Sequence, residues 1–428
     1  MFTFKKGIHP PGEKYLTKDL EIVALPAPKV VYIPLVQHAG TPSTLIVKAG
    51  DNVKKGQLIA VPKELGANIH SSLCGTVLGV ISMMNAQGTR TQYVKIENDY
   101  KNTEFKLPPL KENCLKEDIV QRVKDAGIVG MGGAAFPTHI KLTPKTGKEI
   151  DTLIINGCEC EPHLNCDYRI MKERTKEFIE GCMLLKKAVN AKVVVIAIEE
   201  HNSDIVSLLK TFNSVDVAIL KPKYPQGAEK MLIYALTRRK VPLGKLPIDV
   251  GIIVSNVQTA YAVYEAVVFG KTSYERVITV SGGAINNPKN LSAVYGTPLS
   301  EIVDFCGGFK QKPKKVIIGG PMTGYTQFSL NTVVTKRTSG VMFLTQDEIN
   351  SNALTACINC ARCAKNCPMN LMPMYIESGY LSGDLAASKK YGALHCIECG
   401  SCAYNCPANR PLVQSIRLAK KLIKDKKI

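Results

Sequence analysis

The 428-residue sequence contains no tryptophan, and aromatic residues make up only 6% of it. With few aromatic side chains to stack on bases and no recognisable nucleic-acid-reading motif, we expect no nucleic-acid partner. No apolar run approaches the roughly 18 residues of a membrane-spanning helix. The first residues lack an apolar h-region and a cleavage site, so we expect no signal peptide.

Cysteine, in contrast, is present in a specific arrangement. Eight of the fifteen cysteines form two quartets. They read Cys357-x2-Cys360-x2-Cys363-x3-Cys367-Pro368 and Cys396-x2-Cys399-x2-Cys402-x3-Cys406-Pro407. This is the spacing of a bacterial two-cluster ferredoxin. Paired Cys-x2-Cys units also make zinc sites, but those need two pairs rather than two runs of four ending in Cys-Pro. Disulfides are the weaker alternative.

The spacing also predicts how the cysteines divide between two clusters. In each quartet three thiolates can close around one cubane, while the fourth, just before a proline, usually ligates the other cluster. One 4Fe–4S cluster is therefore assigned to Cys357, Cys360, Cys363 and Cys406, and the other to Cys396, Cys399, Cys402 and Cys367. Such clusters transfer electrons. Free thiols and oxygen-sensitive clusters indicate a reducing cytoplasm.

The chain is also strongly basic, with 55 Lys and Arg residues against 36 Asp and Glu, a formal net charge of +19. Acidic redox partners or an anionic membrane surface suit such a charge. A solvated basic surface that maintains solubility is the alternative.

Residues 1–113 predict an N-terminal β region. The stretch 29–99 alternates short strands with Gly and Asp turns. Its rhythm resembles the barrel-sandwich hybrid of biotinyl and lipoyl domains. The lysine that carries the prosthetic arm in those domains is not evident, so a purely structural role is the preferred interpretation.

Residues 114–270 alternate helix and strand signals, which predicts a Rossmann-like domain: a mainly parallel sheet with helices on both faces. We expect helices at 117–126, 169–189 and 204–212, and strands at 153–156 and 193–198.

A glycine loop lies within this domain. Gly130-x-Gly132-Gly133 removes β-carbons where a backbone must approach a ligand and supplies amide donors for a phosphate, which Lys141 would neutralise. An ordinary tight turn is the alternative for a glycine loop taken alone.

A polar segment, Asn156-Gly157-Cys158-Glu159-Cys160-Glu161-Pro162, follows the strand at 153–155. Loops leaving the carboxyl ends of parallel strands form the ligand crevice in open α/β sheets. Two acids and an amide there would hold polar groups of a flavin or a ribose, and a solvated Glu-Pro turn is the alternative. Cys158, Cys160 and Cys166 lack iron–sulfur spacing and are interpreted as non-ligand thiols.

Taken with residues 224–229 and 255–259, these segments resemble the flavin- and NADH-binding subunit of respiratory complex I. The resemblance implies an FMN site formed by Gly130, Gly132, Gly133, Lys141, Asn156, Glu159 and Asn256. It implies that Phe136, Glu161 and Glu229 line the side of the nicotinamide nucleotide. The sequence departs from that family at four places: Cys158 replaces Asp, Ala135 replaces Gly, Ala228 replaces Glu and Ser255 replaces Asn.

The remaining chain predicts two more modules. Residues 271–345 resemble the soluble-ligand-binding β-grasp module, expected to be a spacer, with a strand and tight turn at 317–324 to which no role is assigned. Residues 346–428 are the two-cluster ferredoxin domain, with helices at 373–381 and 385–391. A basic amphipathic helix at 412–423 is expected to pack its apolar stripe on this domain. Membrane or partner docking is the alternative, based on the charge run 424–427.

The order of these modules resembles the RnfC family over almost the whole chain, most sharply at residues 133–141, 156–162 and 391–402. That family supplies the NADH-facing peripheral subunit of the Rnf ferredoxin:NAD oxidoreductase complexes. The resemblance implies a cytoplasmic subunit bound to integral-membrane subunits that translocate sodium ions or protons, with ferredoxin as a direct or indirect partner.

The reaction implied is electron transfer between two 4Fe–4S clusters and FMN, with hydride exchange with NAD, in an NAD-linked oxidoreductase. No acid–base catalytic residue is expected. A stand-alone relative that reduces a soluble partner with NADH is one alternative. A scaffold that holds clusters without flavin is the other.

Overall fold

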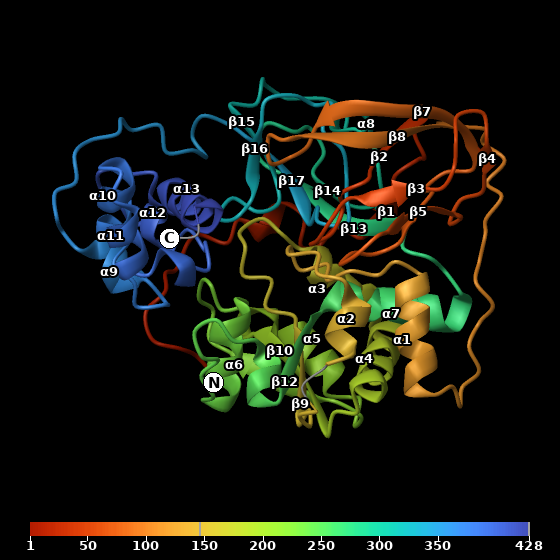
Figure 1. Ribbon diagram of the computed structural model, residues 1–428, viewed down its shortest axis with the longest axis horizontal. Helices are drawn as coiled ribbons and strands as arrows, with labels where there is room; N and C mark the ends of the chain where they lie inside the picture. Colours follow the sequence, from red (N-terminus) through yellow and green to blue (C-terminus); the bar gives the residue numbers. More distant parts are fainter. Residues whose placement is uncertain (145–146, 427–428) are drawn as a thin grey trace.

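The computed structural model describes residues 1–144 and 147–426 of the chain. The fold is multidomain and mixed α/β (Figure 1). An orange β-rich part lies above a green and yellow parallel sheet with its helices, and a blue helical part lies beside both. Within the described residues, none of the helices has the length and apolar character needed to cross a membrane.

The N-terminal β-rich part consists of two antiparallel sheets, as the turn-punctuated pattern predicts. One has the order β2 (Val30–Pro34), β8 (Arg90–Asn98), β7 (Gly75–Met84) and β4 (Asn52–Val53). The other has the order β3 (Ser43–Leu45), β5 (Leu58–Pro62) and β6 (Ile69–His70). Their inner faces share one apolar core, because alternate residues of a strand point to the same side.

The middle of the chain forms a four-stranded, all-parallel sheet. Its strand order is β11 (Asp216–Leu220), β10 (Val193–Glu199), β9 (Thr152–Asn156) and β12 (Ile252–Asn256). Leu153 and Ile155 face one apolar core, and Ile154 faces another. The predicted parallel sheet with helices on both faces is confirmed.

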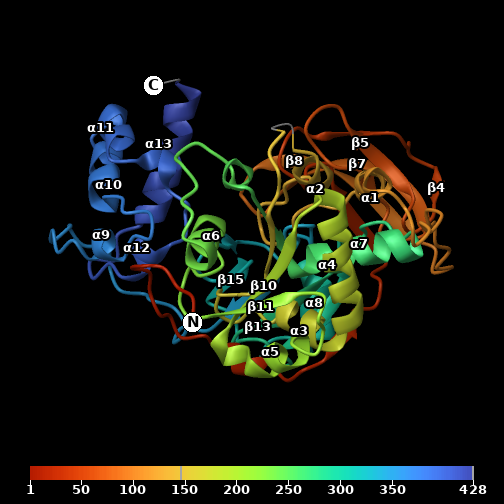
Figure 2. The same cartoon turned by 90° about the horizontal axis from the view of Figure 1, so that it is seen from below.

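Helices cover the two faces unequally. The larger core contains residues of α1 (Lys116–Asp125), α2 (Thr138–Leu142), α3 (Cys166–Glu173), α4 (Thr175–Val189), α5 (Ser203–Leu209) and α7 (Val257–Phe269). The smaller one is closed by α6 (Glu229–Thr237). Figure 2 shows α1, α4 and α7 grouped on the side away from the blue part. Short 3-10 turns occur at Lys14–Leu16, Glu200–Asn202, Pro247–Val250 and Ala393–His395.

The expectation of one continuous helix over 169–189 is wrong. The chain forms α3 and α4 with a break at Arg174, whose φ of −128° and ψ of 39° are not helical. The Thr175 hydroxyl donates to the Met171 and Lys172 carbonyls, which competes with regular helical hydrogen bonding. The break leaves α3 free to turn its first residues toward the ends of the central strands.

A six-stranded mixed sheet combines one strand from the N-terminal segment with five strands that follow the parallel sheet in the chain. Its order is β1 (Ile22–Ala24), β14 (Lys289–Val294), β13 (Glu275–Ser281), β17 (Gly340–Leu344), β15 (Lys315–Ile318) and β16 (Tyr325–Gln327). Helix α8 (Leu299–Phe305) packs against it. Its edge strand β1 belongs to the N-terminal segment and pairs in parallel with β14. This segment is therefore part of the six-stranded sheet and not of the barrel part.

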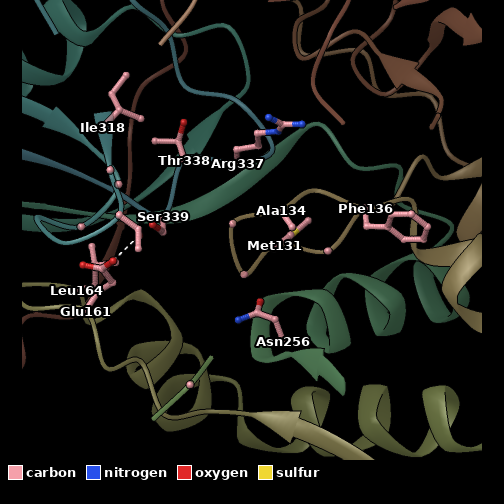
Figure 3. Close-up of a pocket in the computed structure, with 18 of the residues that line it drawn as sticks. Met131, Ala134, Phe136, Glu161, Leu164, Asn256, Ile318, Arg337, Thr338 and Ser339 are labelled. Carbon is pink, nitrogen blue, oxygen red and sulfur yellow. Dashed lines mark hydrogen bonds between the residues drawn. The ribbon is translucent and has the colours of Figure 1, made fainter. Parts of the chain in front are cut away.

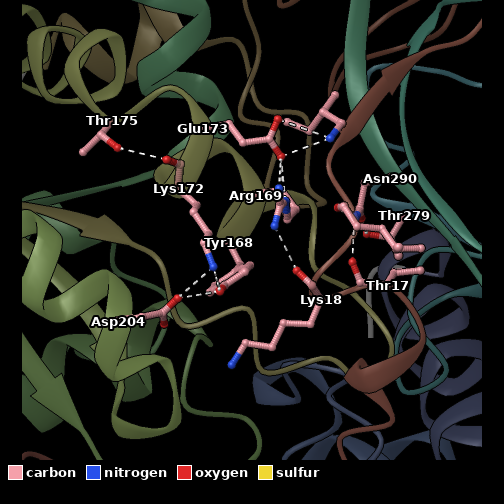
Figure 4. A network of polar contacts seen from close by, with 12 residues as sticks. Thr17, Lys18, Tyr168, Arg169, Lys172, Glu173, Thr175, Asp204, Thr279 and Asn290 are labelled. Carbon is pink, nitrogen blue, oxygen red and sulfur yellow. Dashed lines mark hydrogen bonds and ion pairs between the residues drawn. The ribbon is translucent and has the colours of Figure 1, made fainter.

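Buried polar contacts hold the N-terminal segment in place (Figure 4). Asn290 donates from Nδ2 to the carbonyl of Thr17, and Arg169 donates to the carbonyl of Lys18. Glu173 pairs with Arg169 at 2.6 Å and accepts the amide of Ile22. The segment is thereby tied to both α3 and the six-stranded sheet.

The cysteine quartets lie in a small helical part built from α9 (Arg362–Asn366), α10 (Pro373–Leu381), α11 (Leu385–Lys390), α12 (Ser401–Tyr404) and α13 (Leu412–Asp425). Ile416 and Ile423 of α13 are buried against Ile376 of α10. The prediction that the apolar stripe of this helix packs on the cluster part is confirmed. Of the charge run 424–427, Lys427 lies outside the described residues.

Candidate functional site

The candidate site lies where the order of the parallel strands reverses. From β9 the chain moves to β10 and β11 on one side and later returns to β12 on the other. Asn156 and Asn256 are register partners and each is the last residue of its strand, β9 and β12. Ligand crevices of open α/β sheets lie at such reversals, beyond the carboxyl ends of the strands.

A cavity of about 940 Å³ opens at this point. Every residue predicted to bind FMN or the nicotinamide nucleotide lines it: Gly130, Gly132, Gly133, Phe136, Lys141, Asn156, Glu159, Glu161, Glu229 and Asn256. Each of the other parts of the fold also reaches it, through the turn at Asn85–Gln87, the turn at Gly319–Gly324 and the segment Ile397–Cys399. The barrel part therefore contributes to the wall of the cavity, which the purely structural interpretation did not foresee.

The glycine loop is anchored at both of its ends. The amide of Gly130 donates to the Phe136 carbonyl, and the amide of Met131 donates to Thr259 Oγ1 in the first turn of α7. Gly133 has a φ of +117°, a conformation that favours glycine, and open space surrounds its missing β-carbon. At Gly130, Gly132 and Gly133 the backbone thus lines the cavity without a side chain, which leaves room for a planar cofactor.

Asn256 lies against this loop (Figure 3). Its Oδ1 accepts the amides of Gln258 and Thr259 as the N-cap of α7, and its Nδ2 donates to Asp167 Oδ2 at 2.6 Å. Burial and then the neighbouring Glu159 carboxylate raise the pKa of Asp167. Sequence reasoning missed Asp167, although its position in the first turn of a helix beside the polar segment was a usable signal.

Asn156 and Glu159 are fixed by backbone groups. Asn156 Nδ2 donates to the Gly227 carbonyl at 2.8 Å. Glu159 accepts the amides of Asp167 and Tyr168 at 2.9 and 3.1 Å, at the start of α3. A carboxylate is favoured there by the free amides and the helix dipole. These side chains are therefore oriented by the fold before any ligand arrives.

Lys141 and Glu229 contact each other. Lys141 Nζ lies 2.9 Å from Glu229 Oε1, with side chains 34% and 41% exposed. The residue expected near the FMN phosphate and the residue expected near the nucleotide thus form one ion pair at the junction of α2 and α6. In this arrangement each charge is compensated by the other.

Glu161 is held by the turn between β15 and β16, to which the sequence assigned no role. Its carboxylate accepts the Met322 amide at 3.0 Å and the Thr323 hydroxyl. Burial raises the pKa of Glu161, an effect opposed by these donors. A β-carbon on Gly320 would lie 2.3 Å from Glu161 Oε2, so the approach needs glycine. The run Gly319-Gly320-Pro321-Met322-Thr323 was the available signal.

The cysteines gather in two groups. Cys357, Cys360, Cys363 and Cys406 line one small cavity of about 20 Å³. Cys402 lies near the three other cysteines of the second group. Burial, followed by the thiols of Cys396, Cys399 and Cys367, raises the pKa of Cys402. Each group thus draws on both quartets. These groupings are the ones predicted for the two clusters.

The second group adjoins the large cavity. Cys399 lines it directly, and the Tyr224 hydroxyl donates to the Cys399 carbonyl at 2.6 Å. Cys158 lies apart from both groups, buried beneath the sheet with Sγ directed at the Ala197 carbonyl. A redox centre held by the second group would therefore face the glycine loop across one continuous space.

Known families match the chain in four consecutive segments. Residues 2–101 match the RnfC barrel sandwich hybrid domain, 123–265 the Nuo51 FMN-binding domain, 277–326 the SLBB domain and 349–407 a 4Fe-4S dicluster domain. A subunit of the proton-translocating ferredoxin:NAD(+) oxidoreductase complex of Clostridium ljungdahlii is 42% identical over 98% of this chain and 93% of its own length. The chain belongs to the RnfC family.

Further members of the RnfC family show the same extent of similarity. The corresponding protein of the Na(+)-translocating ferredoxin:NAD(+) oxidoreductase complex of Acetobacterium woodii is 40% identical over 98% of this chain and 97% of its own. That of the ion-translocating oxidoreductase complex of Rhodobacter capsulatus is 40% identical over 98% and 83%. FMN and 4Fe–4S clusters are accordingly the cofactors of this chain, and the loop with its three glycines and the two cysteine groups fit them.

A solved structure shares the fold. A chain of an NAD+-reducing [NiFe]-hydrogenase in the H2-reduced state matches with a TM-score of 0.54 and 19% identity, over 72% of this chain and 61% of its own. The air-oxidized state gives a TM-score of 0.52, also at 19% identity, over 65% and 54%.

Proposed function

We propose that this chain is the RnfC component of an ion-translocating ferredoxin:NAD oxidoreductase complex, in which it passes electrons between two 4Fe–4S clusters and FMN for hydride exchange with NAD. The observation that carries the proposal is the single cavity shared by the glycine loop and Cys399. FMN, when bound, exchanges hydride with a nicotinamide and single electrons with iron–sulfur clusters. The chain's own residues bind the cofactors, orient them and insulate them from solvent.

In this proposal the glycine loop and the two asparagines at the strand ends hold the flavin. Gly132 and Gly133 give it backbone amides, and Gly130, whose own amide donates to the Phe136 carbonyl, leaves room beside it. Glu159, Asn156 and Asn256 give it fixed polar groups. Lys141 contributes charge on the phosphate side. Phe136, Glu161 and Glu229 face the nicotinamide nucleotide, and the hydroxyl and amide that hold Glu161 keep its carboxylate in one orientation.

The two clusters have unequal positions. The cluster proposed for Cys396, Cys399, Cys402 and Cys367 is proximal to the flavin, because Cys399 lines the cavity. The cluster proposed for Cys357, Cys360, Cys363 and Cys406 is distal, and Cys357 and Cys360 are exposed. A redox partner would therefore exchange electrons with the distal cluster, and the proximal cluster would connect it to the flavin.

The proposed modules are the barrel-sandwich region at 1–113, the FMN- and NAD-binding Rossmann-like domain at 114–270, the β-grasp and connecting region at 271–345, and the ferredoxin domain at 346–428. Strand β1, which pairs with β14, supports counting residues 22–24 with the third module. The protein would lie on the cytoplasmic face of the cell membrane through its partner subunits, coupled to sodium ions or protons.

Fractionation of the native cell tests the assignment to a complex. We expect the chain to sediment with membranes, to resist a low-salt wash, and to purify after mild detergent extraction with integral-membrane subunits and NADH-dependent dye reduction. A chain found entirely in the supernatant, with full dye reduction and no membrane partner, would instead support a stand-alone NADH-dependent electron-transfer flavoprotein.

A further inference from the structure

The cavity contains one basic side chain for which the described part of the chain provides neither an ion pair nor a hydrogen-bond acceptor. The basic residues lining it are Lys141, Lys230, Arg276, Arg337 and Arg417. Lys141 pairs with Glu229, and Arg417 with Glu398 at 3.0 Å. Arg276 donates to the carbonyls of Lys336 and Met131, and Lys230 to that of Pro242. The Arg337 guanidinium makes no ion pair or hydrogen bond to any described residue, and its buried Nε lacks a partner.

Such an arginine is costly in the absence of a ligand. A guanidinium carries five N–H donors, and a buried donor without an acceptor loses its hydration without compensation. Burial lowers the pKa of Arg337, and the nearby Tyr325 opposes this effect. Because a guanidinium stays charged in proteins, a site of this kind favours an anion that brings its own acceptor oxygens.

The turn that carries Arg337 is rigidly supported. The preceding residue, Lys336, is fully buried, and its Nζ donates to the carbonyls of Asn68 at 2.8 Å and Gly127 at 2.6 Å. The Arg337 amide donates to Thr335 Oγ1. The turn is thus tied to the barrel part and to the start of the glycine loop, so the backbone that carries the Arg337 side chain is fixed beside the cavity.

The position of Arg337 separates it from the strand ends. Figure 3 shows Arg337 and Asn256 on opposite sides of the loop that carries Met131 and Ala134. Arg337 shares the cavity with Thr338 and Ser339 of its own segment and with the barrel turn at Asn85–Gln87. A ligand reaching from the glycine loop toward the barrel would place an anionic group beside this arginine.

We propose that Arg337 forms a phosphate subsite, contributed by the six-stranded sheet together with the barrel turn rather than by the Rossmann-like domain. A guanidinium binds phosphate through paired N–H donors. The phosphate belongs either to the pyrophosphate of the nicotinamide dinucleotide or to FMN. This inference rests on the proposed function, since both ligands come from it.

The test compares holoprotein of the wild type and of Arg337→Gln, using ADP-ribose and adenosine as calorimetric probes and flavin released by acid as a second readout. If the subsite takes the pyrophosphate, the dissociation constant of ADP-ribose rises about tenfold or more, while that of adenosine and the flavin content stay unchanged. If it takes the flavin phosphate, flavin content falls while the affinity of flavin-loaded protein for ADP-ribose is retained.

Two further variants make the outcome decisive. Arg337→Lys keeps the charge without the planar donors, so we expect a smaller loss of ADP-ribose affinity or of flavin content. This variant also serves as the test if Arg337→Gln does not fold. Arg90→Gln removes a matched charge from the exposed end of the β7–β8 hairpin, outside the cavity, and should match the wild type. Unchanged ADP-ribose affinity and flavin content in both Arg337 variants would overturn the subsite. A wild type that binds neither ligand would instead contradict the proposed function.

Discussion

Three polar side chains of this site accept hydrogen bonds from backbone amides that hold them in place. Glu159 is held by amides of α3, Asn256 by amides of α7, and Glu161 by the turn after β15. Hydrogen bonds from backbone amides to a carboxylate favour its charged form and fix its direction. The loss of one such donor should therefore alter ligand binding without unfolding the protein.

The Thr323 hydroxyl offers the mildest such change. Thr323→Val removes one of the two donors to Glu161, so we expect the KM for NADH to rise by about threefold to tenfold with little change in flavin content. Steady-state NADH-dependent dye reduction measures the effect. Thr326→Val, an exposed change on β16, is the control. A KM identical in both variants would show that Glu161 does not depend on this turn.

Although Lys141 and Glu229 form one ion pair, we expect their removal to affect different ligands. Lys141→Ala should weaken FMN retention while the cluster spectrum stays intact, and Glu229→Ala should raise the KM for NADH more than it disturbs bound flavin. Because both side chains are partly exposed, either loss should change stability by only about 1 kcal/mol or less. Flavin content after desalting, visible absorbance and NADH kinetics separate the two roles. Undiminished flavin in Lys141→Ala would exclude its assignment to the phosphate side.

At the scale of elements, the carboxyl end of β10 buries an acid. Glu199 is 3% exposed, and its Oε1 has no hydrogen-bond partner among the described residues. Burial raises the pKa of Glu199 from 4.5 to about 8, and Lys14 opposes the shift. Its neighbour His201 has a pKa lowered to about 4, chiefly by burial, and is therefore neutral at pH 7.

This burial predicts a pH-dependent stability. Between pH 4.5 and about 8 the folded state binds more protons at Glu199 than the unfolded chain does, so stability falls as the pH rises through this window. Glu199→Gln removes the dependence, and we expect its melting temperature to exceed that of the wild type by a margin that grows from pH 6 to pH 9. Thermal melts across this range measure it, with the exposed Glu200→Gln as control. A constant margin would contradict the raised pKa.

The docking of α13 on α10 depends on a buried ion pair. Glu377 of α10 is 3% exposed, pairs with Arg410 at 3.0 Å and accepts the Ser415 hydroxyl. Glu377→Ala would leave Arg410 without its carboxylate, at a cost of about 3 kcal/mol, and should speed iron loss from the clusters. Anaerobic denaturation and the rate of iron release measure these two effects, with Lys421→Ala at an exposed position as the control. Equal iron release in both variants would mean that the pair does not stabilise the cluster part.

The elements also show what sequence can and cannot predict. The cysteine groups, the parallel sheet and the polar segment that begins at Asn156 follow from local spacing and periodicity. Asn256 came only from the resemblance to the complex I subunit, and the structure places it beside Asn156. The break before Thr175 is not visible in the periodicity, because the hydroxyl of Thr175 bonds to the Met171 carbonyl within an otherwise continuous helical pattern. The partners of Glu161 and the position of Arg337 depend on contacts between segments more than a hundred residues apart, which periodicity does not encode.

In the whole molecule, the cavity lies where four parts of the fold come together. The barrel, the parallel sheet, the six-stranded sheet and the cluster part all contribute to its lining. The two cysteine groups therefore have distinct environments, one beside the cavity and one with two exposed cysteines. This asymmetry suits a chain that passes electrons between an external partner and a nucleotide.

Anaerobic cofactor analysis followed by titration with NADH tests whether one cavity joins flavin chemistry to two clusters. We expect one FMN and about eight irons per chain, with NADH bleaching the flavin absorbance and electrons then reaching the clusters, detected by their paramagnetic resonance. A protein that holds eight irons, contains no flavin and does not respond to NADH would contradict it.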